Sequence, residues 1–276
     1  MQLHFSKMHG LGNDFVVIDA IRQTVRLTSA QIRCLARRRF GIGCDQVLLV
    51  EAPTRPDALF RYRIFNADGG EVNQCGNGAR CFARFVRDEG LTAAAEIPVE
   101  TAAGLLVLQL EADGAVTVNM GQPQWTPMAI PLVVEQPALS YTVEHAGESY
   151  QFVAVGLGNP HAVLQVEAVA AAPVQTLGKV LQQDPRFPES VNVGFMQIDG
   201  RDHIRLRVLE RGVGETLACG SGACAAVVAG RRLGLLEETV VVELSGGRLR
   251  VSWAGSDAPV YLTGPAERVF EGKIEV

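Results

Sequence analysis

Two short segments of the chain each carry a cysteine in front of a glycine turn, and they are near copies of one another. One reads VNQCGNGARC (72–81) and the other LACGSGACA (217–225), and each has a Glu four residues before the first cysteine. A cysteine directly before a helix lies where backbone N–H groups and the helix dipole favour an anion, which lowers the pKa of a thiol. The pattern therefore predicts two thiols suited to proton transfer, each beside a turn whose N–H groups bind a carboxylate.

Two such thiols suit the inversion of a carbon centre. One thiolate removes a proton from an α-carbon, and a thiol on the opposite face returns another, which is racemisation or epimerisation with two bases and no cofactor. Equivalent motifs in a duplicated chain commonly face each other across a cleft. We therefore expect Cys75 and Cys219 to share one active site in an interdomain cleft.

The cysteines also allow a structural, a zinc-binding or a redox role. A cysteine before a glycine turn is often only a small buried residue, and duplication alone would copy a structural cysteine. However, the flanking segments differ strongly between the two copies, whereas Cys-Gly-x-Gly-Ala is retained in both. A zinc site is disfavoured by the C-x5-C and C-x4-C intervals, and a thiol–disulfide redox protein would normally show C-x-x-C, so we expect no metal.

The remaining cysteines divide into three predicted core residues and one ambiguous residue. Cys34 lies on a helical pattern, and Cys81 and Cys224 follow the glycine turns by one or two helical turns, so all three are predicted to be buried. Cys44 lies in a predicted loop after Gly-Ile-Gly, and its role stays open.

Composition limits the classes of partner. The 276 residues carry a net charge of −5, and the only basic cluster is the short run 37–39, which we interpret as the solvated end of a helix. This balance argues against nucleic acid as a partner. No apolar run of about 18 residues indicates a membrane span, and the first ten residues lack the apolar core of a signal peptide, so we expect a cytoplasmic protein.

The two cysteine motifs belong to a longer internal repeat. Cys75 and Cys219 are 144 residues apart, Gly-Asn recurs at 12 and 158 with an offset of 146, and Gln46 and Asn192 share that offset. Segments 100–121 and 243–264 align at an offset of 143 and both resemble a strand, a turn and a strand. Several correspondences within three residues of one offset indicate a tandem duplication.

Each half is predicted to contain the same elements. A short strand (15–18 or 152–155) precedes a helix, two strands, the cysteine turn, a second helix and a strand pair. The helix at 28–40 begins with the capping pattern Thr28-x-x-Gln31 and places Ile32, Leu35, Ala36 and Phe40 on one face. We expect an α+β fold of two pseudo-symmetric domains, each a curved, mostly antiparallel sheet around a central helix. The predicted domains are 1–120 with 265–276, carrying Cys75, and 121–264, carrying Cys219.

The same residues resemble the diaminopimelate epimerases from end to end of the chain. The resemblance rests on ordered motifs: GLGNDFVVID, GIGCDQ, FNADGGEVNQCGNGARC, GNPH, VNVGF, ERGVGETLACGSGACA and VYLTGPAE. It implies conversion of LL-diaminopimelate to the meso form without pyridoxal phosphate, in lysine and peptidoglycan precursor synthesis. It also implies a homodimer.

The resemblance implies roles for individual residues. Cys75 and Cys219 match the acid/base pair, with Cys75 the proton donor and Cys219 the acceptor in the LL-to-meso direction. His161 and Glu210 match residues that tune the pKa of a catalytic thiol. The positions that match the substrate-binding set are Asn13, Gln46, Asn66, Gly76, Asn77, Asn159, Asn192, Glu210, Arg211, Gly220 and Ser221.

The chain differs from the diaminopimelate epimerase pattern at two positions, and one other class of enzyme would share its paired cysteines. Phe270 lies where the family often has a tyrosine that helps to hold the dimer, and Cys44 lies where a small apolar residue is more usual. A proline-type racemase would also have paired cysteines. It would not need the adjacent Glu210 and Arg211, which suit the second amino-acid end of diaminopimelate because a guanidinium binds a carboxylate through two hydrogen bonds.

Overall fold

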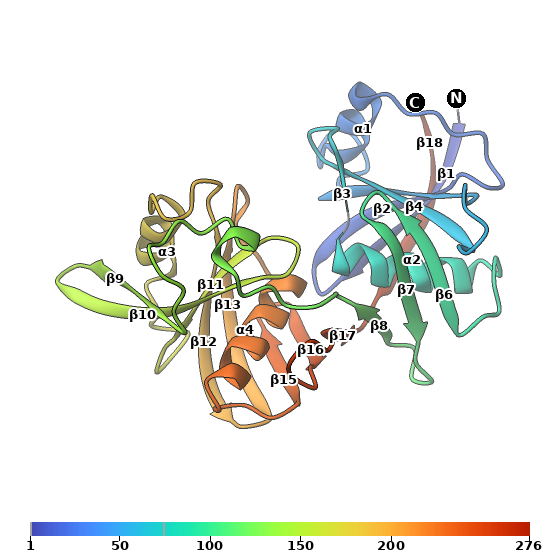
Figure 1. The fold of residues 1–276 in the computed structure, drawn as a ribbon. Helices are drawn as coiled ribbons and strands as arrows, with labels where there is room; N and C mark the ends of the chain where they lie inside the picture. Colours follow the sequence, from blue (N-terminus) through green and yellow to red (C-terminus); the bar gives the residue numbers. More distant parts are fainter. Residues whose placement is uncertain (1, 74) are drawn as a thin grey trace. The chain divides into compact units, whose positions relative to one another are not determined.

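The computed structural model describes residues 2–73 and 75–276. It forms two compact units, Met1–Asn119 with Thr263–Val276 and Met120–Leu262 (Figure 1). Each unit combines a mixed sheet with two α-helices.

The first unit is built on a sheet that wraps around helix α2. Its elements are β1 (Gln2–Gly10), β2 (Asn13–Asp19), α1 (Ser29–Ala36), β3 (Gln46–Glu51), β4 (Phe60–Asn66), β5 (Glu71–Val72), α2 (Gly76–Asp88), β6 (Glu96–Thr101), β7 (Gly104–Leu110), β8 (Val116–Asn119) and β18 (Glu267–Glu275). Strands β2 and β3, and β4 and β6, pair in parallel, whereas β1–β2, β1–β18, β3–β4, β4–β5, β6–β7 and β7–β8 pair antiparallel. The last strand of the chain therefore lies beside the first.

The second unit repeats this plan around helix α4. Its elements are η1 (Pro127–Ala129), β9 (Tyr141–His145), β10 (Glu148–Gly156), β11 (Pro160–Gln165), α3 (Val174–Gln182), β12 (Asn192–Gly200), β13 (His203–Glu210), β14 (Gly214–Glu215), α4 (Gly220–Arg232), β15 (Thr239–Leu244), β16 (Gly247–Ser252) and β17 (Tyr261–Gly264), the strand in which the chain leaves the unit. Here β11–β12 and β13–β15 are the parallel pairs.

The registers of the two sheets confirm the tandem repeat. Phe15 pairs with Gln46 in the first unit and His161 with Asn192 in the second, which is the offset of 146 seen in the sequence. Phe65 pairs with Glu71 and Leu209 with Glu215, at the offset of 144 that separates the two cysteines. The predicted α+β repeat with mostly antiparallel sheets is therefore confirmed.

Both central helices are buried, and the second glycine of each cysteine turn makes this possible. In α2 the apolar side chains of Phe82, Phe85 and Val86 are almost completely buried, and α4 uses small residues from Ala223 to Gly230 instead. A Cβ atom on Gly78 would lie 2.7 Å from the Tyr62 hydroxyl, and one on Gly222 would lie 2.9 Å from Val208. Close contact with β4 and β13 thus explains why both copies keep this glycine.

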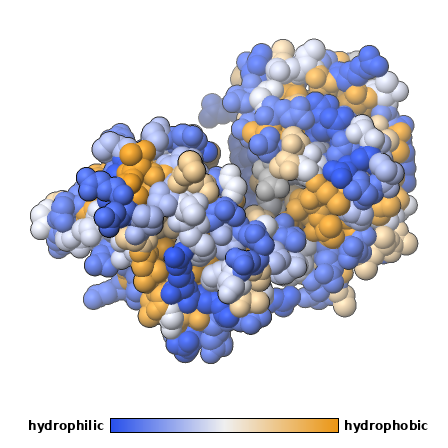
Figure 2. Space-filling model, in the orientation of Figure 1, coloured by the Kyte–Doolittle hydropathy of each residue, from blue (hydrophilic) through white to orange (hydrophobic). Residues whose placement is uncertain are grey.

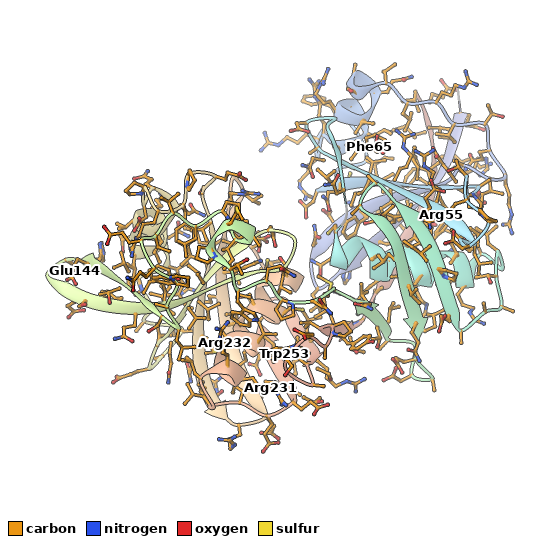
Figure 3. The ribbon with its side chains drawn as sticks, in the orientation of Figure 1. Arg55, Phe65, Glu144, Arg231, Arg232 and Trp253 are labelled. Carbon is orange, nitrogen blue, oxygen red and sulfur yellow. The ribbon has the colours of Figure 1, made fainter. Side chains whose placement is uncertain are left out.

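On the face shown in Figure 2, orange apolar patches are broken up by hydrophilic residues in both units. The segment that opens the second unit is held by Trp125, whose ring centroid lies 4.0 Å from the guanidinium carbon of Arg232 and 6.1 Å from the ring centroid of Trp253, both labelled in Figure 3. This contact joins the start of the unit to the end of α4.

Two expectations about the first helix are wrong, for separate reasons. Helix α1 keeps the predicted capping box at Thr28 but ends at Ala36, because Arg37 is extended. Phe40 therefore leaves the apolar face and is 83% exposed. Cys34 lies within the helix but outside its buried face, so it is exposed rather than buried. The basic run 37–39 is exposed and directly follows the helix, as predicted, and the Arg38 guanidinium also donates two hydrogen bonds of 2.8 Å to Asp14. Cys81 and Cys224 are buried, as predicted, and Cys44 is buried as well.

Candidate active site

The first thiol lies at the N-cap of α2. The Cys75 backbone is extended (φ −144°, ψ 121°), and its carbonyl accepts from the N–H of Ala79 at 2.8 Å and from the Tyr62 hydroxyl at 3.2 Å. Its Sγ lies 3.8 Å from Oδ1 of Asn13, which also accepts from Nδ2 of Asn77 at 3.2 Å. The structure thus brings three of the predicted residues, Asn13, Cys75 and Asn77, into one cluster.

Two more predicted residues lie on neighbouring strands of the same sheet. Gln46 begins β3, Asn66 ends β4, and they occupy directly opposite positions in the antiparallel ladder. The Gln46 amide donates to Oδ1 of Asn66 at 2.8 Å. Because Phe15 on β2 pairs with Gln46, this amide pair lies close to the strand end that carries Asn13.

The second thiol occupies the equivalent N-cap of α4 but is more enclosed. Cys219 is 3% exposed, and its Sγ accepts from the backbone N–H of Gly222 at 3.4 Å. The Ser221 hydroxyl lies 3.7 Å from the same sulfur and accepts from Nδ2 of Asn159 at 3.4 Å.

His161 joins this cluster through Asn159. Its Nε2 lies 2.9 Å from Oδ1 of Asn159, and burial, with a smaller contribution from the Arg211 charge, lowers the pKa of the imidazole to about 3. The ring is therefore neutral, and because Oδ1 of Asn159 can only accept, Nε2 carries the proton. Within its unit, His161 reaches Cys219 by way of Asn159 and Ser221.

Glu210 lies close enough to Cys219 to change the pKa of its thiol. This pKa is raised, whereas the sequence predicts that it is lowered. Burial raises the pKa of the Cys219 thiol well above its ordinary value, and the Glu210 carboxylate adds to this by its charge and by accepting a hydrogen bond from the thiol. The predicted lowering of this pKa by the helix N-terminus is therefore wrong for Cys219. The Gly222 N–H and the Ser221 hydroxyl act in the expected direction but do not offset burial.

Asn192 and Arg211 complete the cluster in the second unit. The Asn192 amide donates to the carbonyl of Pro160 at 3.1 Å, and its Oδ1 accepts from the backbone N–H of Arg211 at 2.9 Å. The Arg211 guanidinium donates to the Glu189 carbonyl at 2.8 Å and is 37% exposed, so it remains accessible to a ligand.

Sequence reasoning missed the residues that support these groups. Asp45 accepts from the Asn13 amide at 2.9 Å, and the Thr216 hydroxyl donates to Glu210. Both lie inside motifs quoted above, GIGCDQ and ERGVGETLACG, but a carboxylate or hydroxyl beside a candidate residue carries no signal in the sequence about its partner.

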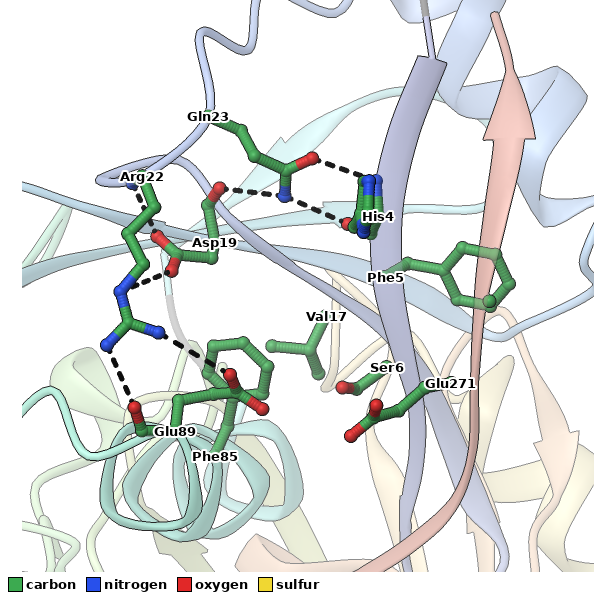
Figure 4. A pocket seen from close by; sticks show the side chains of 11 residues that line it. His4, Phe5, Ser6, Val17, Asp19, Arg22, Gln23, Phe85, Glu89 and Glu271 are labelled. Atoms are coloured by element: carbon green, nitrogen blue, oxygen red, sulfur yellow. Dashed lines mark hydrogen bonds and ion pairs between the residues drawn. The ribbon is translucent and has the colours of Figure 1, made fainter.

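A pocket of about 310 Å³ in the first unit contains none of the predicted residues. It lies between β1 and the C-terminal end of α2, where Arg22 bridges Asp19 and Glu89 and where Phe5, Ser6 and Glu271 line the wall (Figure 4). Cys75 lies at the other end of that 13-residue helix, roughly 20 Å away. The pocket is therefore separate from the thiol cluster of its unit.

Residues 2–73 and 75–276 show neither a candidate metal site nor a candidate membrane-spanning helix. No group of three or more His, Cys, Asp or Glu side chains is arranged to hold a metal ion. In the same residues, no helix is long and apolar enough to cross a membrane.

Solved structures of other proteins share this fold. The chain superimposes with a TM-score of 0.69 on a probable proline racemase from Agrobacterium radiobacter, at 17% identity over 99% of this chain and 93% of that one. A hydroxyproline epimerase from Agrobacterium vitis gives 0.68 at 16% identity, over 99% and 92%. At such identities the likeness concerns the fold alone.

The sequence comparisons are more specific. The family model described as diaminopimelate epimerase matches residues 5–126 and 153–269. Relatives named diaminopimelate epimerase are 63% identical in Thioalkalivibrio sulfidiphilus and 54% identical in Pseudomonas aeruginosa, in both cases over 100% of each chain. The chain belongs to the diaminopimelate epimerase family, and it is an isomerase.

Removing the Glu210 charge should make Cys219 easier to ionise. Because the carboxylate raises the pKa of this thiol, Glu210→Gln should lower that pKa. Alkylation of Cys219 by iodoacetamide at pH 7 should then become roughly tenfold faster, while epimerisation slows. Mass spectrometry across a pH series measures the alkylation rate. Glu144→Gln, on the distant strand β9, is the matched control, and equal rates in the two variants would remove Glu210 from the environment of Cys219.

Proposed function

We propose that the chain epimerises LL-2,6-diaminopimelate to meso-diaminopimelate with Cys75 and Cys219 as a two-base pair. One observation carries the proposal: two units of the same topology each place a cysteine at the N-cap of their buried central helix. The proposal requires both turns to meet at one α-carbon of the substrate. Thiols then supply and accept the protons, so no cofactor and no metal takes part.

In the LL-to-meso direction, Cys219 removes the α-proton and Cys75 delivers a proton to the opposite face. Abstraction requires the thiolate of Cys219, and Glu210 is the neighbouring carboxylate that accepts from this thiol. Cys75 begins protonated, with the Asn13 oxygen 3.8 Å from its sulfur. The α-proton passes from carbon to the Cys219 thiolate, and the Cys75 thiol gives its proton to the opposite face of the same carbon. Cys219 ends as a thiol and Cys75 as a thiolate, and the reverse reaction exchanges the two roles.

The first turns of α2 and α4 would bind the α-carboxylate of the substrate. N–H groups at Gly76 and Asn77, and at Gly220 and Ser221, belong to the helix N-termini, where anions are favoured. Two helix N-termini directed at one carboxylate also stabilise the negative charge that develops when the α-proton leaves.

The remaining predicted residues account for the far end of the substrate and the ammonium groups. Arg211 would bind the distal carboxylate, and Glu210 would bind an ammonium as well as tune Cys219. The amides that would complete the substrate-binding set are Asn13, Gln46, Asn66, Asn159 and Asn192. His161, neutral and buried, would fix the Asn159 amide and through it the surroundings of Cys219.

We further propose that the enzyme is a cytoplasmic homodimer that serves lysine and peptidoglycan precursor synthesis. The dimer contact would include Phe270 on β18, which is 47% exposed and lies edge-on to Phe5 with ring centroids 6.0 Å apart. Phenylalanine at this position offers apolar area to a partner but no hydroxyl contact.

Each thiol should be indispensable. Cys75→Ala and Cys219→Ala should each lower kcat by about 10²- to 10⁴-fold, because every turnover needs one base and one acid. Epimerisation of LL-diaminopimelate without added pyridoxal phosphate, followed by chiral chromatography, measures this. Cys34→Ala, which removes an exposed thiol, is the control and should keep the normal rate. A single active-site variant that still epimerises at close to the normal rate would show that the two-thiol mechanism is wrong.

Loss of the Arg211 guanidinium should impair diaminopimelate turnover through binding and alignment. Arg211→Ala is expected to lower kcat/KM by roughly 100-fold, because a misaligned α-carbon no longer lies in line with both sulfurs. Arg205→Ala, which removes an arginine from the ion pair with Asp199 on the same sheet, is the control. Near-normal kcat/KM in the Arg211 variant would exclude this residue from the site.

A further inference from the structure

The orientation of the Asn13 side chain is fixed by a carboxylate. Nδ2 of Asn13 donates to Oδ2 of Asp45 at 2.9 Å. A carboxylate accepts and does not donate, so the amide nitrogen must face Asp45 and the amide oxygen must point the other way. That oxygen accepts from Asn77 and lies 3.8 Å from the Cys75 sulfur.

Asp45 is itself held by a network of charged side chains. The Arg38 guanidinium binds Oδ1 of Asp45 at 2.6 Å and pairs with Asp14, which in turn pairs at 2.7 Å with Lys7, whose side chain is only 10% exposed. The backbone N–H groups of Asp14 and Asp45 also donate to each other's carboxylates, at 3.2 and 2.8 Å. Two cations therefore stabilise two adjacent carboxylates directly behind Asn13.

The second unit holds the equivalent asparagine the other way round. Asn159 turns its oxygen to the Nε2–H of His161 and its nitrogen to Ser221, the residue that lies beside Cys219. At the repeat offset of 146, Val153, Pro160 and Val191 replace Lys7, Asp14 and Asp45. The second unit thus lacks this charged network, and its asparagine amide has the opposite orientation to that of Asn13.

We propose that Asp45 is a positioning residue that aims the Asn13 oxygen at Cys75 and so holds this thiol in its protonated form. The inference rests on the two-thiol function proposed above and adds to it the device that distinguishes the two halves. An amide oxygen stabilises an S–H donor and opposes a thiolate, whereas an amide N–H would do the reverse. The Asn13 oxygen thereby favours the thiol form of Cys75, which is the form that donates a proton in the LL-to-meso direction.

Other ionisable groups of the same unit keep their charge state in the test. Arg80 on α2 is a fully buried cation that is present in every variant used below. The Tyr62 phenol donates to the Cys75 carbonyl, and burial raises its pKa well above the ordinary value. Burial also raises the pKa of the Cys81 thiol to about 12. Both groups stay neutral over the pH range of an alkylation experiment.

The test measures the reactivity of Cys75 and needs no substrate. In Asp45→Ala the Asn13 amide loses its acceptor and can turn its nitrogen to the sulfur. Alkylation of Cys75 at pH 7 should then become roughly tenfold faster, with its pH midpoint shifted down, while Cys219 in the same sample is unchanged. kcat should fall more than KM rises. Asp45→Asn retains an oxygen acceptor and should restore most of the normal profile.

Three further variants separate orientation from stability. Asp57→Ala removes an exposed carboxylate paired with Arg55 and should change nothing. Arg38→Gln leaves the Asp45 carboxylate beside Nδ2 of Asn13, so it should lower the melting temperature but change the Cys75 profile much less than Asp45→Ala does. Asn13→Asp puts an acceptor-only group beside the thiol and should slow alkylation. An unchanged Cys75 profile in Asp45→Ala, or the same shift in Arg38→Gln, would overturn the proposal, whereas failure of the two-thiol function would show instead as activity in Cys75→Ala.

Discussion

The constraint on which the site depends is the N-cap position of one cysteine in each unit. The sulfur lies at the start of a helix that is buried along its length, so its position is determined by how closely that helix approaches the sheet. Gly78 and Gly222 permit this approach, since a single methyl group at either position would meet a side chain of β4 or β13. A preorganised sulfur needs little rearrangement when a proton is transferred.

The same backbone supports two different electrostatic environments. In the first unit a network of Lys7, Asp14, Arg38 and Asp45 fixes Asn13, and in the second a neutral His161 fixes Asn159 in the opposite sense. At the offset of 144, Asn66 on β4 corresponds to Glu210 on β13, so the position that holds an amide in the first unit holds the carboxylate that acts on Cys219 in the second. Duplication thus supplied the scaffold, and polar substitutions gave the two thiols distinct surroundings.

Much of the fold and of the site could be predicted from the sequence, because a repeat compares each half with the other. The offsets at Gln46 and Asn192 proved to be strand registers, and Cys-Gly-x-Gly proved to be the start of a buried helix in both units. Local periodicity was less informative: it extended α1 to Phe40, although the chain turns away after Ala36. The pKa of Cys219 was also beyond reach, because burial depends on the packing of the whole unit.

Proton flow tests the central claim most directly. A reaction started with LL-diaminopimelate in D2O reports which hydrogen reaches the α-carbon of the product. If one sulfur abstracts and another donates, product molecules should carry deuterium from the first turnover while unreacted substrate stays nearly unlabelled. Return of the original hydrogen to the product, or early appearance of deuterium in recovered substrate, would indicate a single base and contradict the account.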